Sequence, residues 1–82
     1  MPFFRRRRHV YEAFQWLPDQ PDPPGLLRYA GAPRDLAHVH SARGNDPAHL
    51  GDWIVPDPDG EHYEAYSDAR LRQLFESVPP AT

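Results

Sequence analysis

The stretch from Gly51 to Val78 reads GDWIVPDPDGEHYEAYSDARLRQLFESV. Two short runs rich in aromatic and β-branched residues, 51–55 and 61–66, flank the proline, aspartate and glycine residues of 56–60. Such runs on either side of a turn-forming sequence are typical of a β-hairpin. We therefore predict strand, turn and strand at the start of the C-terminal third.

A helix is predicted directly after this hairpin. Ser67 is a suitable N-cap residue, and Asp68 places a negative charge at the positive end of the helix dipole. Apolar residues then recur at the i, i+3, i+4, i+7 spacing of one helix face. They are Leu71, Leu74, Phe75 and Val78. This face needs a sheet to cover it.

The first strand is predicted over residues 8–16. Alternation places Val10, Glu12, Phe14 and Trp16 on one face of that strand. Glu12 interrupts the apolar face, so it is either buried with a partner or lies at a gap where the strand meets solvent.

Residues 17–50, the middle of the chain, are predicted to form loops and short secondary-structure elements. Residues 17–24 contain too many prolines for the interior of a sheet and form a loop. Residues 25–30 are predicted as a short helix that Gly31 and Pro33 end. Three further segments follow as a strand, a turn and a short edge segment, at residues 35–40, 41–46 and 47–50.

Together these elements predict one α+β domain over residues 1–82. Its sheet is small, curled and mainly antiparallel, with four to five strands, because the chain lacks the long crossover connections of a parallel sheet. The C-terminal helix packs on this sheet, and the short helix follows the first strand. Residues 1–4 and 79–82 are predicted to be frayed ends.

Length and composition limit the class of protein. The chain has 82 residues and no cysteine, which excludes disulfides and thiolate metal sites. The N-terminal arginines are not followed by the apolar segment of a signal peptide, and no apolar run is long enough to span a bilayer. We therefore expect a cytoplasmic protein that does not act in a membrane.

Two groups of residues stand near the ends of the chain: the early motif EAFQW at 12–16, and the late motif GDWIV at 51–55 with Gly60-Glu61, Tyr63 and Phe75-Glu76. In this order they resemble a family of small bacteriophage and prophage proteins. The late motif is sometimes called the PGDYG domain; Leu50 stands here where the family usually has proline. The resemblance implies a phage-related origin and brings no catalytic residues with it.

The charges predict one possible nucleic-acid interface. Arg5, Arg6, Arg7 and Arg8 form a basic block in a chain whose formal net charge is −3. Such a block is suited to phosphate contacts, with Phe3, Phe4, Tyr11 and Trp16 available to stack on bases. The acidic remainder of the chain favours the other interpretation, a solvated edge.

The histidines predict at most a weak metal site. His38 and His40 lie two residues apart, so on a strand they share a face and are able to grip one ion, with His49, His62 or Glu64 as a third ligand. The competing interpretation is that both rings face solvent while Ala37 and Val39 face the core. We therefore predict no metal and no other cofactor.

The functional prediction is a non-catalytic protein-binding module. The chain has no nucleophile motif and no phosphate-binding glycine loop, so we expect no enzyme activity. It has many aromatic residues for a small domain, and aromatic residues beyond what the core can hold favour a partner-binding surface. The competing interpretation is that most of these residues form the core. The candidate surface residues are Trp16, Trp53, Tyr63 and Tyr66. The expected partner is a host or phage protein, and we also expect a homodimer through Trp53, Tyr63 or Tyr66.

Overall fold

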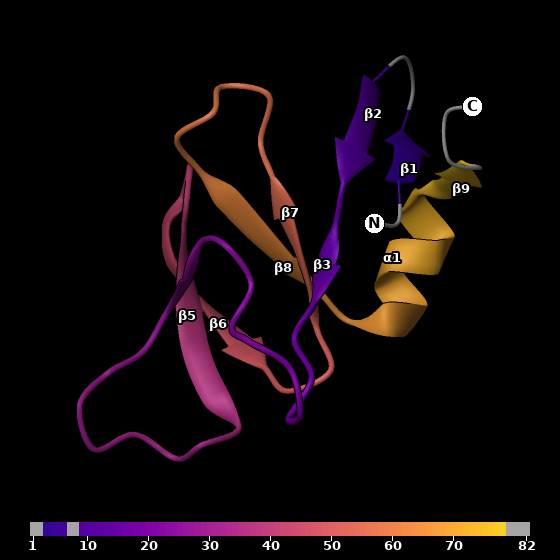
Figure 1. Ribbon diagram of the computed structural model, residues 1–82. Coiled ribbons are helices and arrows are strands. Elements are labelled where there is room, and N and C mark those ends of the chain that lie inside the picture. The colour runs from indigo at the N-terminus through magenta and orange to yellow at the C-terminus, as the bar shows by residue number, and fades with distance from the viewer. Residues whose placement is uncertain (1–2, 7–8, 79–82) are drawn as a thin grey trace.

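The computed structural model describes residues 3–6 and 9–78 (Figure 1). Within these residues it contains nine strands and one helix. The strands are β1 (Phe3–Arg6), β2 (His9–Glu12), β3 (Phe14–Gln15), β4 (Leu26–Leu27), β5 (Leu36–Ser41), β6 (Gly44–His49), β7 (Trp53–Pro56), β8 (Tyr63–Tyr66) and β9 (Glu76–Val78). The helix α1 spans Asp68–Leu74.

The strands form three antiparallel sheets of three strands each, in the orders β2-β1-β9, β3-β7-β8 and β4-β5-β6. Only Ala13 separates β2 from β3, so one stretch of chain enters two sheets. Figure 1 shows the β5–β6 hairpin at one end of the molecule and α1 at the other. The antiparallel pairing and the C-terminal helix confirm the coarse α+β prediction, but the single sheet of four to five strands was wrong.

Strand β7 connects the two hydrophobic clusters of the core. Trp53 and Val55 belong to a cluster with Phe4, Ala13, Leu71 and Phe75. Ile54 belongs to the other, with Val39 and Ala48. Because successive side chains of a strand point to opposite faces, β7 is buried on both sides. Strand β1 and helix α1 pack on one face of β7, and strands β5 and β6 pack on the other.

The predicted hairpin is present. Strands β7 and β8 pair from Trp53↔Tyr66 to Pro56↔Tyr63. The connection between them is held by the Asp59 carboxylate, which accepts hydrogen bonds from the backbone N–H groups of Glu61 and His62 at 2.8 and 3.0 Å.

The helix begins where predicted and ends earlier. The Ser67 hydroxyl accepts a hydrogen bond from the Arg70 N–H at 3.2 Å, as an N-cap does. Leu71 and Phe75 are buried and Leu74 is half-buried. Phe75 is already extended, with φ −123°, and the next residues pair with β1 as β9. Val78 therefore belongs to a strand. Pairing with β1 supplies its backbone hydrogen bonds, whereas one more turn of so short a helix is only marginally stable.

The N-terminal strand contributes to the core, which corrects the prediction of a frayed segment at residues 3 and 4. Phe4 is 3% exposed, and its ring meets that of Trp53 edge-on with centroids 5.3 Å apart. Strand β1 gains backbone partners on both sides, from β2 and β9. The other predicted frayed residues, 1–2 and 79–82, lie outside the described residues.

The first predicted strand is bent at Ala13, which reverses part of the expected burial. Val10 is 55% exposed, whereas Tyr11 packs on the core and Ala13 is completely buried. Trp16 is buried as expected, and Glu12 is half-buried. The alternation fails because the chain passes from one sheet to the next at Ala13.

The helix predicted over residues 25–30 was wrong. Leu26 and Leu27 form β4, paired with Val39 and His38 of β5. Gly25 has φ +88°, a left-handed conformation that no right-handed helix contains, and a Cβ built there lies 2.4 Å from the Tyr63 ring. A turn closed by the Leu26 N–H and the Pro23 C=O at 3.2 Å leads into β4 instead.

The second predicted strand and its turn are confirmed with shifted bounds. Ser41 pairs with Gly44, so the hairpin turn consists of Ala42 and Arg43 alone. Strand β6 therefore occupies most of residues 41–50, which were predicted as a turn and an edge segment. Pro47 is tolerated in β6 because this strand is at the edge of its sheet, where a missing N–H breaks no ladder.

Alanine substitutions at Gly25 and Gly31 distinguish the stability lost to backbone strain from the stability lost to a steric clash. Gly25→Ala and Gly31→Ala both place alanine at positive φ, at a cost of about 1–2 kcal/mol each. Only the Cβ at residue 25 meets another residue, the Tyr63 ring. We expect Gly25→Ala to lower the free energy of unfolding by about 1–3 kcal/mol more than Gly31→Ala in urea titrations. Equal losses would show that Tyr63 does not pack on Gly25.

The substitution Leu71→Ala tests whether this face of α1 packs on the core. Arg72→Ala, at the adjacent exposed residue, is the control. Leu71 is completely buried, so its truncation is expected to cost about 2–5 kcal/mol. Arg72 is exposed, and its one ion pair within the described residues is an i, i+4 contact with Asp68, so its replacement is expected to cost about 0.5 kcal/mol or less. Thermal unfolding measures both; a small loss at Leu71 would contradict the docking of α1.

Candidate functional site

A groove of about 470 Å³ lies between the loop of residues 17–24 and strands β3 and β7. Apolar side chains and prolines make up most of its lining: Phe14, Leu17, Pro21, Pro23, Pro24 and Trp53. The Gln15 side chain is fixed in the wall, because its amide nitrogen donates to the Gly51 C=O at 3.0 Å. The groove is therefore an apolar surface with few polar groups.

Arg28 anchors the loop that forms one wall of the groove. Its guanidinium donates to both carboxylate oxygens of Asp22, at 2.8 and 2.9 Å, and to the Arg34 C=O at 3.2 Å. It also lies 5.0 Å from the centroid of the Trp16 ring. The hydrogen bonds from Arg28 lower the pKa of Asp22, so this carboxylate remains ionised and paired near neutral pH.

A second hollow, of about 280 Å³, shares Leu17, Gln20 and Asp22 of the same loop with the groove. Leu17 lines both hollows, and Leu50, which is 39% exposed, lines the second. Arg28 and Arg34 add cationic groups to its wall. The apolar surface thus continues past the groove, with polar groups around it.

The four predicted partner-binding aromatics do not form one exposed surface. Trp16 and Trp53 are 1% and 7% exposed, so most of each indole lies in the core, although Trp53 also lines the groove and Trp16 the second hollow. Partner binding by these residues remains a prediction from the sequence. Tyr63 and Tyr66 are half-buried. Tyr66 meets Phe75 edge-on at 5.3 Å, and burial raises the pKa of its phenol. A small domain uses such large rings first to cover its own core.

The groove residues that sequence reasoning missed were Leu17 and the prolines of the loop. Their signal was a run of prolines directly after an aromatic strand. That run was interpreted only as a connection, because proline content identifies a loop without saying on which surface it lies.

The two described arginines of the basic block have partners within the chain. Arg5 lies 3.4 Å from the Glu76 carboxylate on the neighbouring strand β9. The Arg6 guanidinium lies 5.8 Å from the centroid of the Phe75 ring. Arg7 and Arg8 lie outside the described residues. Nucleic-acid binding by this block remains a prediction from the sequence.

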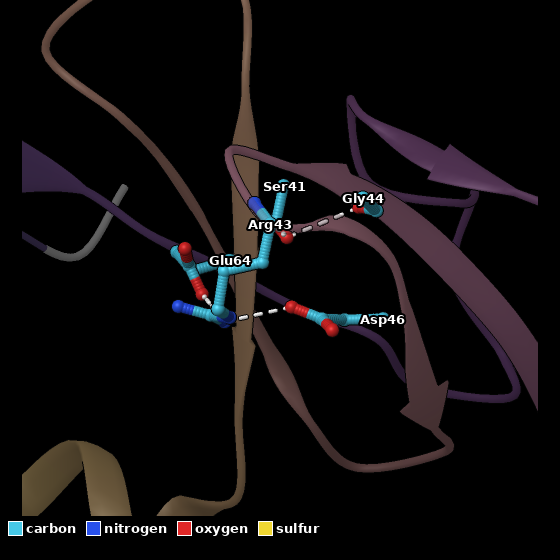
Figure 2. Close-up of polar contacts among 5 residues, drawn as sticks. All are labelled: Ser41, Arg43, Gly44, Asp46 and Glu64. Atoms are coloured by element: carbon cyan, nitrogen blue, oxygen red, sulfur yellow. Dashed lines mark hydrogen bonds and ion pairs between the residues drawn. The ribbon is translucent and has the colours of Figure 1, made fainter.

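A polar network joins the β5–β6 turn to strand β8 (Figure 2). Arg43 donates to the carboxylates of Asp46 and Glu64, both at 2.7 Å. The buried Ser41 hydroxyl holds the turn, since it accepts from the Arg43 N–H and donates to the Gly44 C=O, both at 3.1 Å. The carboxylates of Glu64 and Asp46 raise the pKa of Arg43, whereas the Ser41 hydroxyl and then the Arg43 guanidinium lower the pKa of Asp46. The network is therefore a charged contact between two sheets.

The predicted histidine pair does not form a common site. His38 and His40 share a face of β5 while Ala37 and Val39 are buried, but only His40 is exposed. His38 is half-buried, and its Nδ1 atom is buried without a hydrogen-bond partner among the described residues, which corrects the interpretation that both rings face solvent. The His38 ring instead stacks on Tyr29 with centroids 4.1 Å apart, whereas the His40 ring lies 5.2 Å from that of His62. Glu64, another suggested ligand, is held by Arg43.

Comparisons with protein-family models, curated proteins and solved structures return no match. The phage-family resemblance therefore remains a prediction from the sequence. In the part of the chain that the structure describes, no helix has the length and apolar character needed to cross a membrane.

The contact between Trp53 and Asp68 predicts a pH dependence. The Trp53 indole N–H donates to the Asp68 carboxylate at 3.0 Å, and this bond, with a smaller contribution from Arg72, lowers the pKa of Asp68 below 3.8. A carboxylate with a lowered native pKa stabilises the fold above its unfolded pKa, and this stabilisation is lost as the pH falls through the native pKa. We expect Asp68→Asn to destabilise the chain at pH ~7 and to differ less from the wild type below pH ~3.

Urea midpoints at the two pH values measure this dependence, with Asp19→Asn, in an exposed part of the loop, as the control. A gap between Asp68→Asn and the wild type that stays constant with pH would mean that the Asp68 charge contributes nothing to stability.

Proposed function

We propose that the chain is a non-catalytic protein-binding module, an accessory protein of the phage or prophage type. Its binding surface is the groove between residues 17–24 and strands β3 and β7, which takes up apolar side chains of a protein partner. The observation that carries this proposal is the composition of the groove, in which prolines, Phe14, Leu17 and Trp53 make up most of the lining.

The apolar lining favours a partner that brings apolar side chains. Transfer of apolar surface from water contributes roughly 25 cal/mol per Å², so filling the groove with an apolar side chain is favourable. Small-molecule pockets of similar volume are also mostly apolar, but a small number of precisely placed polar groups orient the ligand in them. Here the Gln15 amide is already bonded to Gly51 and the Asp22 carboxylate to Arg28. The shape of the groove therefore contributes more to recognition than its polar groups.

The rigidity of the loop supports the same function. Proline fixes φ, so a wall built from Pro21, Pro23 and Pro24 loses little conformational freedom when a partner binds. The Asp22–Arg28 pair holds the end of this wall against Trp16. Such a preformed groove is suited to binding an extended segment.

The surroundings of the groove resemble the organisation of a protein interface. Apolar contact extends through Leu17 to the exposed Leu50, while Gln20, Asp22 and Arg34 form polar edges. An apolar centre with a polar rim is the usual anatomy of such surfaces. The partner expected from this arrangement is a peptide segment with one or more large apolar residues.

Selection from a random peptide library on the immobilised chain tests the proposal. We expect enriched peptides to share large apolar residues and to shift the NMR signals of Phe14, Leu17 and the Trp53 indole. Leu17→Glu places a charge in the groove and is expected to weaken binding at least about tenfold, since an unpaired charge is costly in an apolar site. The matched control is Leu27→Glu, because Leu27 is 45% exposed and does not line the groove.

Equal binding by Leu17→Glu and Leu27→Glu, or NMR shifts confined to other strands, would contradict the proposal. Light scattering on the free chain distinguishes a second copy from a foreign partner. A dimer that Leu17→Glu dissociates would identify the occupant as this same chain, in agreement with the predicted homodimer.

A further inference from the structure

Metal-binding side chains gather at the β7–β8 connection, away from the groove. One ligand atom each from Asp57, Asp59 and His62 lie within 4.8 Å of one another. Two ligands of a tetrahedral zinc ion are about 3.3 Å apart, because each lies about 2.0–2.1 Å from the metal. Small side-chain rotations therefore bring these three groups to a common ion.

A further candidate ligand comes from a different sheet. His40 lies on β5, and its ring centroid is 5.2 Å from that of His62, with the ring planes inclined by 31°. His40 is outside the group of three residues whose ligand atoms lie within 4.8 Å of one another, so its exposed side chain has to rotate to reach a common ion. After that rotation, two imidazoles and two carboxylates form a four-ligand set.

The Asp57 carboxylate makes no hydrogen bond and no salt bridge with a side chain among the described residues, although it is half-buried. Its charge acts on the His62 imidazole, whose pKa is raised mainly by the Asp59 hydrogen bond and further by Asp57. Arg43, the cation bound to the neighbouring strand β8, is already held by Asp46 and Glu64. A half-buried carboxylate that lacks hydrogen bonds is stabilised when a positive ion binds beside it.

The contact between Asp59 and His62 shows where an ion fits. The His62 Nδ1 atom lies 2.5 Å from the Asp59 Oδ2 atom, so a hydrogen bond joins the two side chains. The other Asp59 oxygen accepts hydrogen bonds from the backbone N–H groups of Glu61 and His62, which fixes the carboxylate in place. A metal ion between Oδ2 and Nδ1 replaces the proton of the first hydrogen bond and binds to ligands that the turn already orients.

We propose that Asp57, Asp59, His62 and His40 bind a divalent transition-metal ion, of which Zn²⁺ is the best match. Imidazole nitrogen suits zinc and its neighbours in the first transition series, whereas Ca²⁺ and Mg²⁺ prefer oxygen ligands alone. The ion joins the β7–β8 connection to β5, two segments that belong to different sheets. Its role is to fix these sheets to each other beside the Arg43 network.

Calorimetric titration of the untagged 82-residue chain with Zn²⁺ tests the site. We expect one ion per chain. His62→Gln is expected to weaken binding at least about tenfold, and His40→Gln less, because loss of a ligand removes a direct bond. The matched control is His49→Gln: the His49 ring also faces an aspartate three residues away, Asp52 at 3.9 Å, but lies outside the cluster. It is expected to leave the affinity unchanged.

NMR of the wild-type imidazole nitrogens provides a readout that does not depend on a variant. Zinc is expected to shift the ring signals of His40 and His62 and to leave those of His38 and His49 in place. The proposal is overturned if zinc does not saturate the chain at millimolar concentration. It is equally overturned if His49→Gln weakens binding as much as His62→Gln, or if the shifts fall on His38 and His49.

Discussion

The burial of strand β7 on both faces is the constraint on which the rest of the structure depends. Trp53, Ile54 and Val55 are consecutive and all buried, so the chain needs one apolar layer on each side of the strand. A chain of 82 residues cannot supply two large layers. It covers one face with β1 and α1, through Phe4 and Leu71, and the other with the β5–β6 hairpin, which gives three small sheets in place of one.

The same constraint explains why the candidate groove is next to the core. Trp53 packs edge-on against Phe4, donates its N–H to Asp68 and still lines the groove. Its ring is therefore fixed by the fold before any partner binds. The opposite wall is the proline-containing loop 17–24, which the Arg28–Asp22 pair holds in place. The shape of the groove is therefore determined by contacts that also stabilise the fold. A binding surface built in this way loses little entropy on association.

The elements that could be predicted from the sequence are those determined by residues close together in the chain. The β7–β8 hairpin, the Ser67 cap and the strand β5 follow from turn residues, capping chemistry and alternation. What it missed depends on contacts between distant residues: Phe4 is buried because β1 pairs with both β2 and β9, and Gly25 is left-handed beside Tyr63, 38 positions further along the chain. The groove was missed for the same reason, since no local pattern tells which side of Trp53 a loop will cover.

The two proposed binding surfaces lie at opposite ends of one rigid strand. Trp53, at the start of β7, lines the groove, whereas Asp57 follows the last residue of that strand. Four residues of strand span about 13 Å, and effects at sites more than about 7–10 Å apart without shared partners usually add independently. Metal binding at the connection therefore fixes β5 against β8 without reshaping the groove. A module of this kind gains stability at one end and keeps its recognition surface unchanged at the other.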